Sequence, residues 1–113
     1  MGYDLHVTRK EHWFDETGPT IDLAEWVAYI ASDPEVVPDW ENPGPENARF
    51  AAAHGDVPLW WDDGEVLTKN PAPDVIAKLV RIARALGARV QGDEGELYGT
   101  DPNDPTKPSA PET

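Results

Sequence analysis

The stretch Leu59–Lys69 restricts the fold of this chain more than any other part of the sequence. In it, Asp63-Gly64 lies between two short runs of residues that favour β-structure. Asp-Gly suits a two-residue type I′ turn, because both central residues of that turn need positive φ. The stretch therefore predicts a β-hairpin. Trp60 and Trp61 are neighbours on its first strand, so we expect their side chains on opposite faces of the sheet.

A helix is predicted from Asp22 to about Asp33. Asp22 and Glu25 have the spacing of a capping box, in which each residue satisfies a free backbone N–H at the helix start. Pro34 forbids continuation of the helix. The residues expected on its buried face recur at helical spacing and are Leu23, Trp26, Val27 and Ile30.

A second helix is predicted from about Pro73 to Leu86. Proline is tolerated in the first turn, and Gly87 suits the left-handed position just after the last one. The expected buried stripe is Ile76, Leu79, Ile82, Ala83 and Leu86. Three cations of this segment are expected beyond the stripe, namely Lys78, Arg81 and Arg84.

The remaining elements are shorter. Leu5 and Val7 alternate with polar neighbours such as His6, which predicts a half-buried strand over residues 3–9. Further strands are expected at 49–54, 88–91 and 96–98, and an irregular loop at 35–47. Residues 1–98 therefore predict a single α+β domain, with two helices packed on one antiparallel or mixed β-sheet. Residues 99–113 predict a disordered, Pro-rich acidic tail.

Charge and tryptophan are concentrated in the same part of the chain. The formal net charge is −13, and the stretch from Glu11 to Glu65 holds fourteen of the acids but a single base, Arg49. All five tryptophans lie in that stretch. Large aromatic side chains anchor protein interfaces, and a complementary field steers a charged partner towards them. The pattern favours a surface for a basic partner, whereas a solvated acidic face with buried tryptophans is the alternative.

Composition also argues against several classes of partner. A strongly acidic chain lacks the Lys and Arg side chains that bind nucleic-acid phosphates or an anionic membrane surface. The start of the chain has no basic segment followed by an apolar run, and no apolar stretch approaches the roughly 20 residues of a membrane span. With no cysteine, the chain has no disulfide framework or thiol site. We expect a cytoplasmic protein.

No motif for chemistry is visible. The histidines, His6, His12 and His54, have no short helical spacing for a metal site, and the acids around Gly64 lack the ligand pattern of a calcium loop. The chain has no nucleophile elbow and no phosphate-binding glycine loop. We therefore expect no catalysis, catalytic residue, cofactor or metal, although a hydrolase with a site formed only by the fold stays a rival interpretation.

The opening Tyr3–Lys10, Trp13, the segment Ile21–Trp26, Ser32-Asp33-Pro34 and the ending Ala85–Tyr98 form a distinctive set. Together they resemble a family of small, uncharacterised bacterial proteins that begin near Tyr-Asp-Leu-x-Ile-Thr-Arg. The resemblance covers about residues 3–98. That family has no established activity, so the resemblance implies no catalytic residues. In size and acidity the chain is also similar to immunity proteins that neutralise bacterial toxins.

These observations favour an acidic binding protein, an immunity-type inhibitor that occludes a basic bacterial toxin or effector domain. The alternative from another class is a small-molecule or regulatory binding module with an aromatic-lined pocket. The residues expected to bind the partner lie in the 35–47 loop and the hairpin. They are Trp40, Glu41, Trp60, Trp61, Asp62, Asp63 and Glu65.

Overall fold

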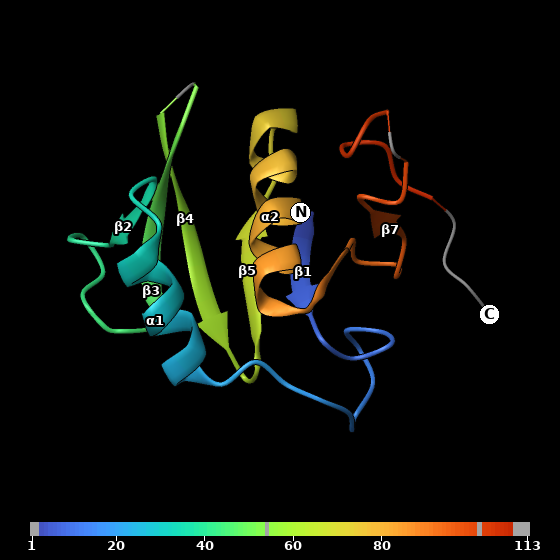
Figure 1. Cartoon of the computed structure of the whole chain (residues 1–113), viewed down its shortest axis with the longest axis horizontal. Helices are drawn as coiled ribbons and strands as arrows, with labels where there is room; N and C mark the ends of the chain where they lie inside the picture. Colours follow the sequence, from blue (N-terminus) through green and yellow to red (C-terminus); the bar gives the residue numbers. More distant parts are fainter. Residues whose placement is uncertain (1–2, 54, 102, 110–113) are drawn as a thin grey trace.

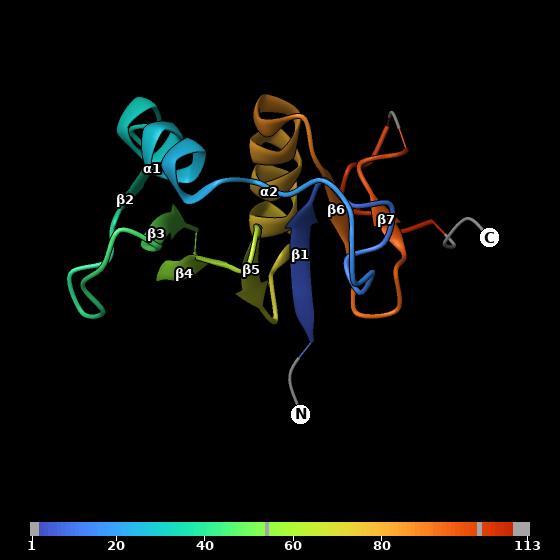
Figure 2. The same cartoon turned by 90° about the horizontal axis from the view of Figure 1, so that it is seen from below.

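The chain folds into one antiparallel sheet with two helices on one of its faces (Figures 1 and 2). The computed structural model describes residues 3–53, 55–101 and 103–109. It confirms the predicted α+β class. In chain order the elements are β1 (Asp4–Thr8), α1 (Leu23–Ser32), β2 (Val36–Pro38), β3 (Asn47–Ala52), β4 (Gly55–Asp62), β5 (Glu65–Lys69), α2 (Pro73–Leu86), β6 (Arg89–Gln91) and β7 (Leu97–Tyr98).

The strand order is β2-β3-β4-β5-β1-β6-β7, and every neighbouring pair is antiparallel. Four consecutive strands, β2 to β5, form a meander. β1 then lies between β5 and β6, which are distant from it in sequence. Figure 2 shows both helices on the same side of this sheet. The opposite side, which neither helix covers, is called the open face below.

The hydrophobic core lies between the helices and the sheet. Leu5 and Val7 of β1 face it and are fully buried, as the alternation predicts. Trp26 of α1 is fully buried beside Ile21, the residue just before the helix cap. The prediction for Val27 is wrong, because its side chain is 40% exposed. α1 is a short helix at the β2–β3 end of the sheet, so only a narrow stripe of it reaches the core.

The β4–β5 hairpin forms as predicted. Asp63 and Gly64 have φ of 49° and 88°, the positive values that a type I′ turn requires. The Trp61 side chain packs on the core side, and its indole N–H donates to the Ile21 carbonyl oxygen at 2.8 Å. Trp60 is its neighbour on the strand and therefore lies on the open face, half-buried.

α2 has the bounds that the sequence predicts, and Gly87 adopts the left-handed conformation (φ 64°) after it. The expectation that Lys78 lies beyond the buried stripe is wrong, because its side chain is only 4% exposed. Its ammonium lies 2.7 Å from an Asp33 carboxylate oxygen and 2.6 Å from one of Glu35. The buried charge is thus compensated by the turn between α1 and β2.

Two other parts of the chain differ from the expectations. The 35–47 segment, predicted to be irregular throughout, contributes β2, which pairs with β3. The predicted strand 49–54 begins earlier, at Asn47, and His54 lies outside the described residues. Neither described helix is long and apolar enough to cross a membrane.

The described part of 99–113 folds back on β7. Ser109 N–H donates to the Leu97 carbonyl oxygen at 2.8 Å, and Leu97 N–H donates to that of Ser109 at 3.0 Å. Residues 102 and 110–113 lie outside the described residues. The domain boundary at residue 98 and the disorder of the segment after it stay predictions.

Candidate functional site

The open face carries polar and aromatic side chains in rows that the strand register defines. One row runs across five strands and consists of Asn47, Trp60, Leu67, His6 and Gln91. In the same register, Asp62 pairs with Glu65 on the row beside it. An antiparallel sheet with helices on one side only must present its other side to solvent or to a covering segment.

The loop from Arg9 to Asp22 supplies part of that cover. Figures 1 and 2 show it leaving β1, turning beside β6 and β7, and returning along one end of the sheet to α1. The end of the loop is hydrogen-bonded to the hairpin turn, since Ile21 N–H donates to the Gly64 carbonyl oxygen at 2.9 Å. The loop and the hairpin thus meet at the same end of the sheet.

A hollow of about 350 Å³ lies where they meet. We call it the acidic hollow. Its lining residues come from the loop and from the hairpin, and they are Lys10, Trp13, Phe14, Asp15, Glu16, Asp62, Asp63 and Glu65. It therefore brings together three of the predicted partner-binding residues, the acids of the hairpin.

The acidic hollow has five carboxylates against one ammonium group. Lys10 donates to the backbone oxygen of Asp15 at 2.9 Å, and it pairs with no carboxylate of the residues that the structure describes. Among the described residues, the carboxylates of Glu16, Asp62 and Asp63 have no hydrogen-bond or ion-pair partner. These three groups are available to an external cation without displacing an internal one.

Aromatic side chains form the wall of the hollow on the loop side. The rings of Trp13 and Phe14 meet edge to face, with centroids 5.6 Å apart. Phe14 is 54% exposed, although it is a large apolar side chain. Acids beside an accessible aromatic ring suit a guanidinium group, which stacks on rings and also pairs with carboxylates.

Trp40 lies on the loop between β2 and β3 and is 73% exposed. Its ring lies 5.7 Å from the guanidinium carbon of Arg49, whose side chain leaves the open face of β3. Arg49 donates to Asp39 at 2.8 Å and to Glu41 at 2.7 Å. The hydrogen bond from Arg49 is the main reason that the pKa of Asp39 falls to about 2. These two hydrogen bonds from Arg49 hold the loop in place on both sides of Trp40.

The predicted site residues do not form one cluster. Arg49, beside Trp40, pairs with Pro58, which is four residues before Asp62 on β4, or about 13 Å along the strand. Trp60 lies between these two places on the same face. A partner interface of ordinary size covers such a span. Trp61, in contrast, points to the helix side and lies off this face.

Sequence reasoning missed the loop as part of the site. Trp13, Phe14 and Glu16 come from a polar segment without regular periodicity, and only the fold places them opposite the hairpin acids. One signal was available in the sequence, the aromatic pair Trp13-Phe14 beside the acids Asp15-Glu16. The aromatic pair lies outside every predicted strand and helix, so its burial in a core was not expected.

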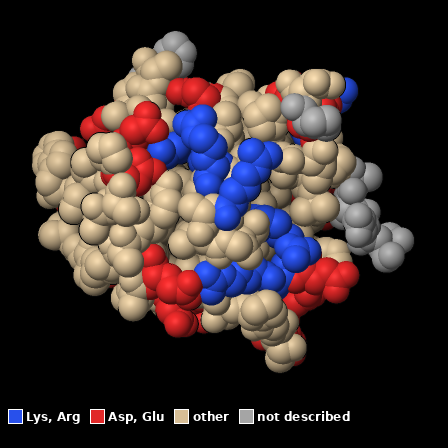
Figure 3. Space-filling model, viewed as in Figure 1, with Lys and Arg blue, Asp and Glu red and all other residues tan. Residues whose placement is uncertain are grey.

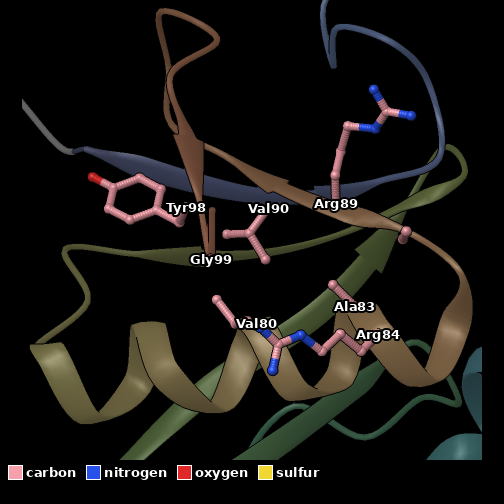
Figure 4. A pocket seen from close by; sticks show the side chains of 8 residues that line it. Val80, Ala83, Arg84, Arg89, Val90, Tyr98 and Gly99 are labelled. Carbon is pink, nitrogen blue, oxygen red and sulfur yellow. The ribbon is translucent and has the colours of Figure 1, made fainter. Parts of the chain in front are cut away.

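The helix side of the molecule has the opposite character. Figure 3 shows Lys and Arg side chains gathered in a band across the middle of that side, over α2, with acids towards its margins. A smaller hollow of about 190 Å³ lies there, between α2 and β6. Figure 4 shows Val80 and Ala83 below it and Val90 and Tyr98 above, while Arg89 points away. It contains no carboxylate and does not suit a basic ligand.

Within the described ranges, no group of three or more His, Asp or Glu side chains is placed to hold a metal ion. No family model matches this chain, and no curated protein or solved structure matches it significantly, so its resemblance over residues 3–98 to a family of small bacterial proteins stays a prediction.

Proposed function

We propose that this chain is a binding protein without catalytic turnover that occludes a basic bacterial toxin or effector domain. Its contact surface is the open face, from the acidic hollow past Trp60 to Trp40. The carboxylates of the hollow would attract the Lys and Arg side chains of the partner, and Trp60 and Trp40 would pack against its surface.

The observation that carries the proposal is the set of unpaired carboxylates in the acidic hollow. Glu16, Asp62 and Asp63 lie together without a cation partner among the described residues. Like charges held close together repel one another, and a bound cation relieves that repulsion. A basic partner therefore gains electrostatic energy here without breaking an ion pair of the free protein.

The distribution of charge supports the choice of face. The helix side carries the band of Lys and Arg over α2 that Figure 3 shows. A basic partner is repelled by that band and attracted by the hollow. Opposite charges on two sides of a small protein also orient the partner during its approach, which raises the association rate more than the final affinity.

The test uses capture followed by quantitative binding. The immobilised chain is exposed to a lysate of its native host, captured proteins are identified by mass spectrometry, and the leading one is purified and titrated at low and high salt. We expect a basic protein whose own activity is lost on one-to-one binding. Neutralising the hollow with Glu16→Gln, Asp62→Asn and Asp63→Asn should slow association and flatten its salt dependence.

The matched control neutralises three acids outside both the hollow and the strands of the open face, with Glu94→Gln, Asp101→Asn and Asp104→Asn. Both triple variants change the net charge by the same amount, so a general charge effect would weaken both equally. Glu65 is left unchanged, because it holds His6 at 2.9 Å and its loss would disturb the fold. Equal binding of the two triple variants would refute the hollow as the contact site.

A small-molecule binding module is the second candidate, and the wall of Trp13 and Phe14 favours it. The volume of about 350 Å³ is within the range of ligand pockets. Five of its eight lining residues are acids, however, whereas such pockets are mostly apolar. A cationic aromatic compound that saturates the hollow, and for which no protein competes, would favour this candidate.

A further inference from the structure

His6 is a buried ionisable residue on the open face of β1. It is 2% exposed, although the alternation of β1 places it away from the core. Its Nδ1 lies 2.9 Å from Oε1 of Glu65, and its Nε2 lies 3.1 Å from Oδ1 of Asp93. A neutral imidazole has one N–H and can donate to only one carboxylate. Two carboxylate partners are satisfied together only by the doubly protonated, charged ring.

The same ring supports the loop that forms the wall of the acidic hollow. The Trp13 indole stacks on His6 with a centroid separation of 3.9 Å and an angle of 6° between the planes. A cation against the face of an indole is attracted to it, and the attraction is stronger away from water. Trp13 also donates its indole N–H to the Asp93 backbone oxygen, and its backbone N–H to the side chain of Gln91.

The charged groups around the ring come from three elements. β5 contributes Glu65, and the segment between β6 and β7 contributes Asp93. β1 itself contributes Asp4, two residues away on the same face, whose backbone N–H donates to Asp93. β6 places the neutral Gln91 opposite His6, and the covering loop places Trp13 against the ring. Two cations share this face one register position away, Lys69 opposite Asp4 on β5 and Arg89 opposite Thr8 on β6. The two groups that contact the ring nitrogens are both carboxylates.

Burial lowers the pKa of His6, but the hydrogen bonds and charges of Glu65 and Asp93 outweigh it, and the net pKa is raised above the ordinary 6.5. A raised pKa makes the charged ring stabilising. That stabilisation is complete below the ordinary value and is lost as the pH rises through the higher value of the folded protein.

We propose that charged His6 is a pH-sensitive clamp that holds the Trp13 wall of the acidic hollow, and that loss of its proton under alkaline conditions loosens the Arg9–Asp22 loop. With one proton gone, a ring nitrogen lone pair faces a carboxylate in a buried site, and the stack on Trp13 loses its cation. The clamp is a property of the free protein, whereas a pH-dependent affinity for a basic partner rests on the proposed function.

The experiment follows the free wild-type protein by NMR from pH 6 to 10, above the range in which carboxyl groups ordinarily titrate. Two-bond proton–nitrogen spectra of the histidine rings report which nitrogens are protonated, and the contact with Trp13 identifies His6. We expect both nitrogens of His6 to be protonated at pH 6, and the Trp13 indole signal to shift with the same midpoint as His6, above 6.5. A His6 midpoint below 6.5, or a Trp13 signal that does not follow His6, would overturn the proposal.

Two single variants separate the clamp from a general charge effect. Asp93→Asn keeps the shape of the side chain but removes one charge, so both midpoints should fall together by about one pH unit or more. Glu94→Gln removes the same charge from the neighbouring exposed position and should move them far less. Equal movement in the two variants would contradict the clamp. Because no partner is present, this result is independent of whether the proposed function is correct.

Discussion

Replacing Lys78 by Met should lower the free energy of unfolding by about 3–5 kcal/mol, the usual cost of removing one partner from a buried ion pair. Methionine keeps an unbranched apolar chain, so the change removes mainly the charge. The side chain of Asp33 is 11% exposed and would be left uncompensated 2.7 Å from the lost ammonium position. Glu35 is 57% exposed and can be solvated, so it adds little to the cost.

The measurement is urea unfolding followed by tryptophan fluorescence, together with thermal melting. For a chain of this size, the expected loss corresponds to a fall in Tm on the order of 10–20 °C. Arg81→Met is the matched control on the same helix. Arg81 is exposed and its guanidinium lies 4.0 Å from Glu35, so its loss should cost under about 1 kcal/mol.

A second substitution tests the cause. Asp33→Asn in the Lys78→Met background removes the stranded charge and should recover most of the lost stability. A loss below about 1 kcal/mol for Lys78→Met would refute the reasoning, because the pair would then be no more than a surface contact. A full loss without recovery in the double variant would show that packing, and not the buried charge, sets the cost.

The same pair gives a prediction for acid. Burial raises the pKa of Asp33, but hydrogen bonds from Lys78 and Tyr29 outweigh it, so the net pKa lies below the ordinary 3.8. A lowered pKa stabilises the fold above the ordinary value, and the stabilisation is lost as the pH falls through the lowered one. The double variant should lack this part of the acid sensitivity in urea titrations between about pH 2 and 5.

Gly64→Ala should cost about 1–3 kcal/mol in urea unfolding, because φ is +88° and the new Cβ would lie 2.6 Å from Cβ of Thr20. Adding Thr20→Gly to this variant should restore only the share of the lost unfolding free energy that comes from the contact with Thr20. Trp60→Ala should weaken binding of the captured partner by about 2 kcal/mol in calorimetric titration, and unchanged affinity would remove Trp60 from the interface. Truncation after Tyr98 should lower Tm by only a few degrees, and a drop of many degrees would make 99–109 part of the folding unit.

The elements that the sequence predicts well are those with local causes. The Asp63-Gly64 turn and the bounds of α2 follow from residues whose backbone preferences act within a few positions. The faces of β1 follow from alternation alone, which places Leu5 and Val7 in the core. Such signals need no knowledge of what the element packs against.

The errors concern residues whose environment comes from distant parts of the chain. Lys78 lies on the edge of a helical stripe, and only the turn with Asp33 makes its burial tolerable. β2 is three residues long and is defined by its pairing with β3. The site shows the same limit: the acids of the hairpin are visible in the sequence, whereas the wall formed by Trp13 depends on a loop path that no local rule sets.

The place of β1 in the sheet has a consequence for how the chain folds. β1 leaves the ribosome before all the strands that it pairs with, yet its partners begin only at Glu65 and Arg89. The meander from β2 to β5 can form from local contacts, while β1 has to close one long loop to pair with β5 and a longer one to pair with β6. Until then Leu5 and Val7 belong to an unpaired apolar strand, the kind of segment that self-associates. We therefore expect the insertion of β1 to be a late, aggregation-sensitive step of folding.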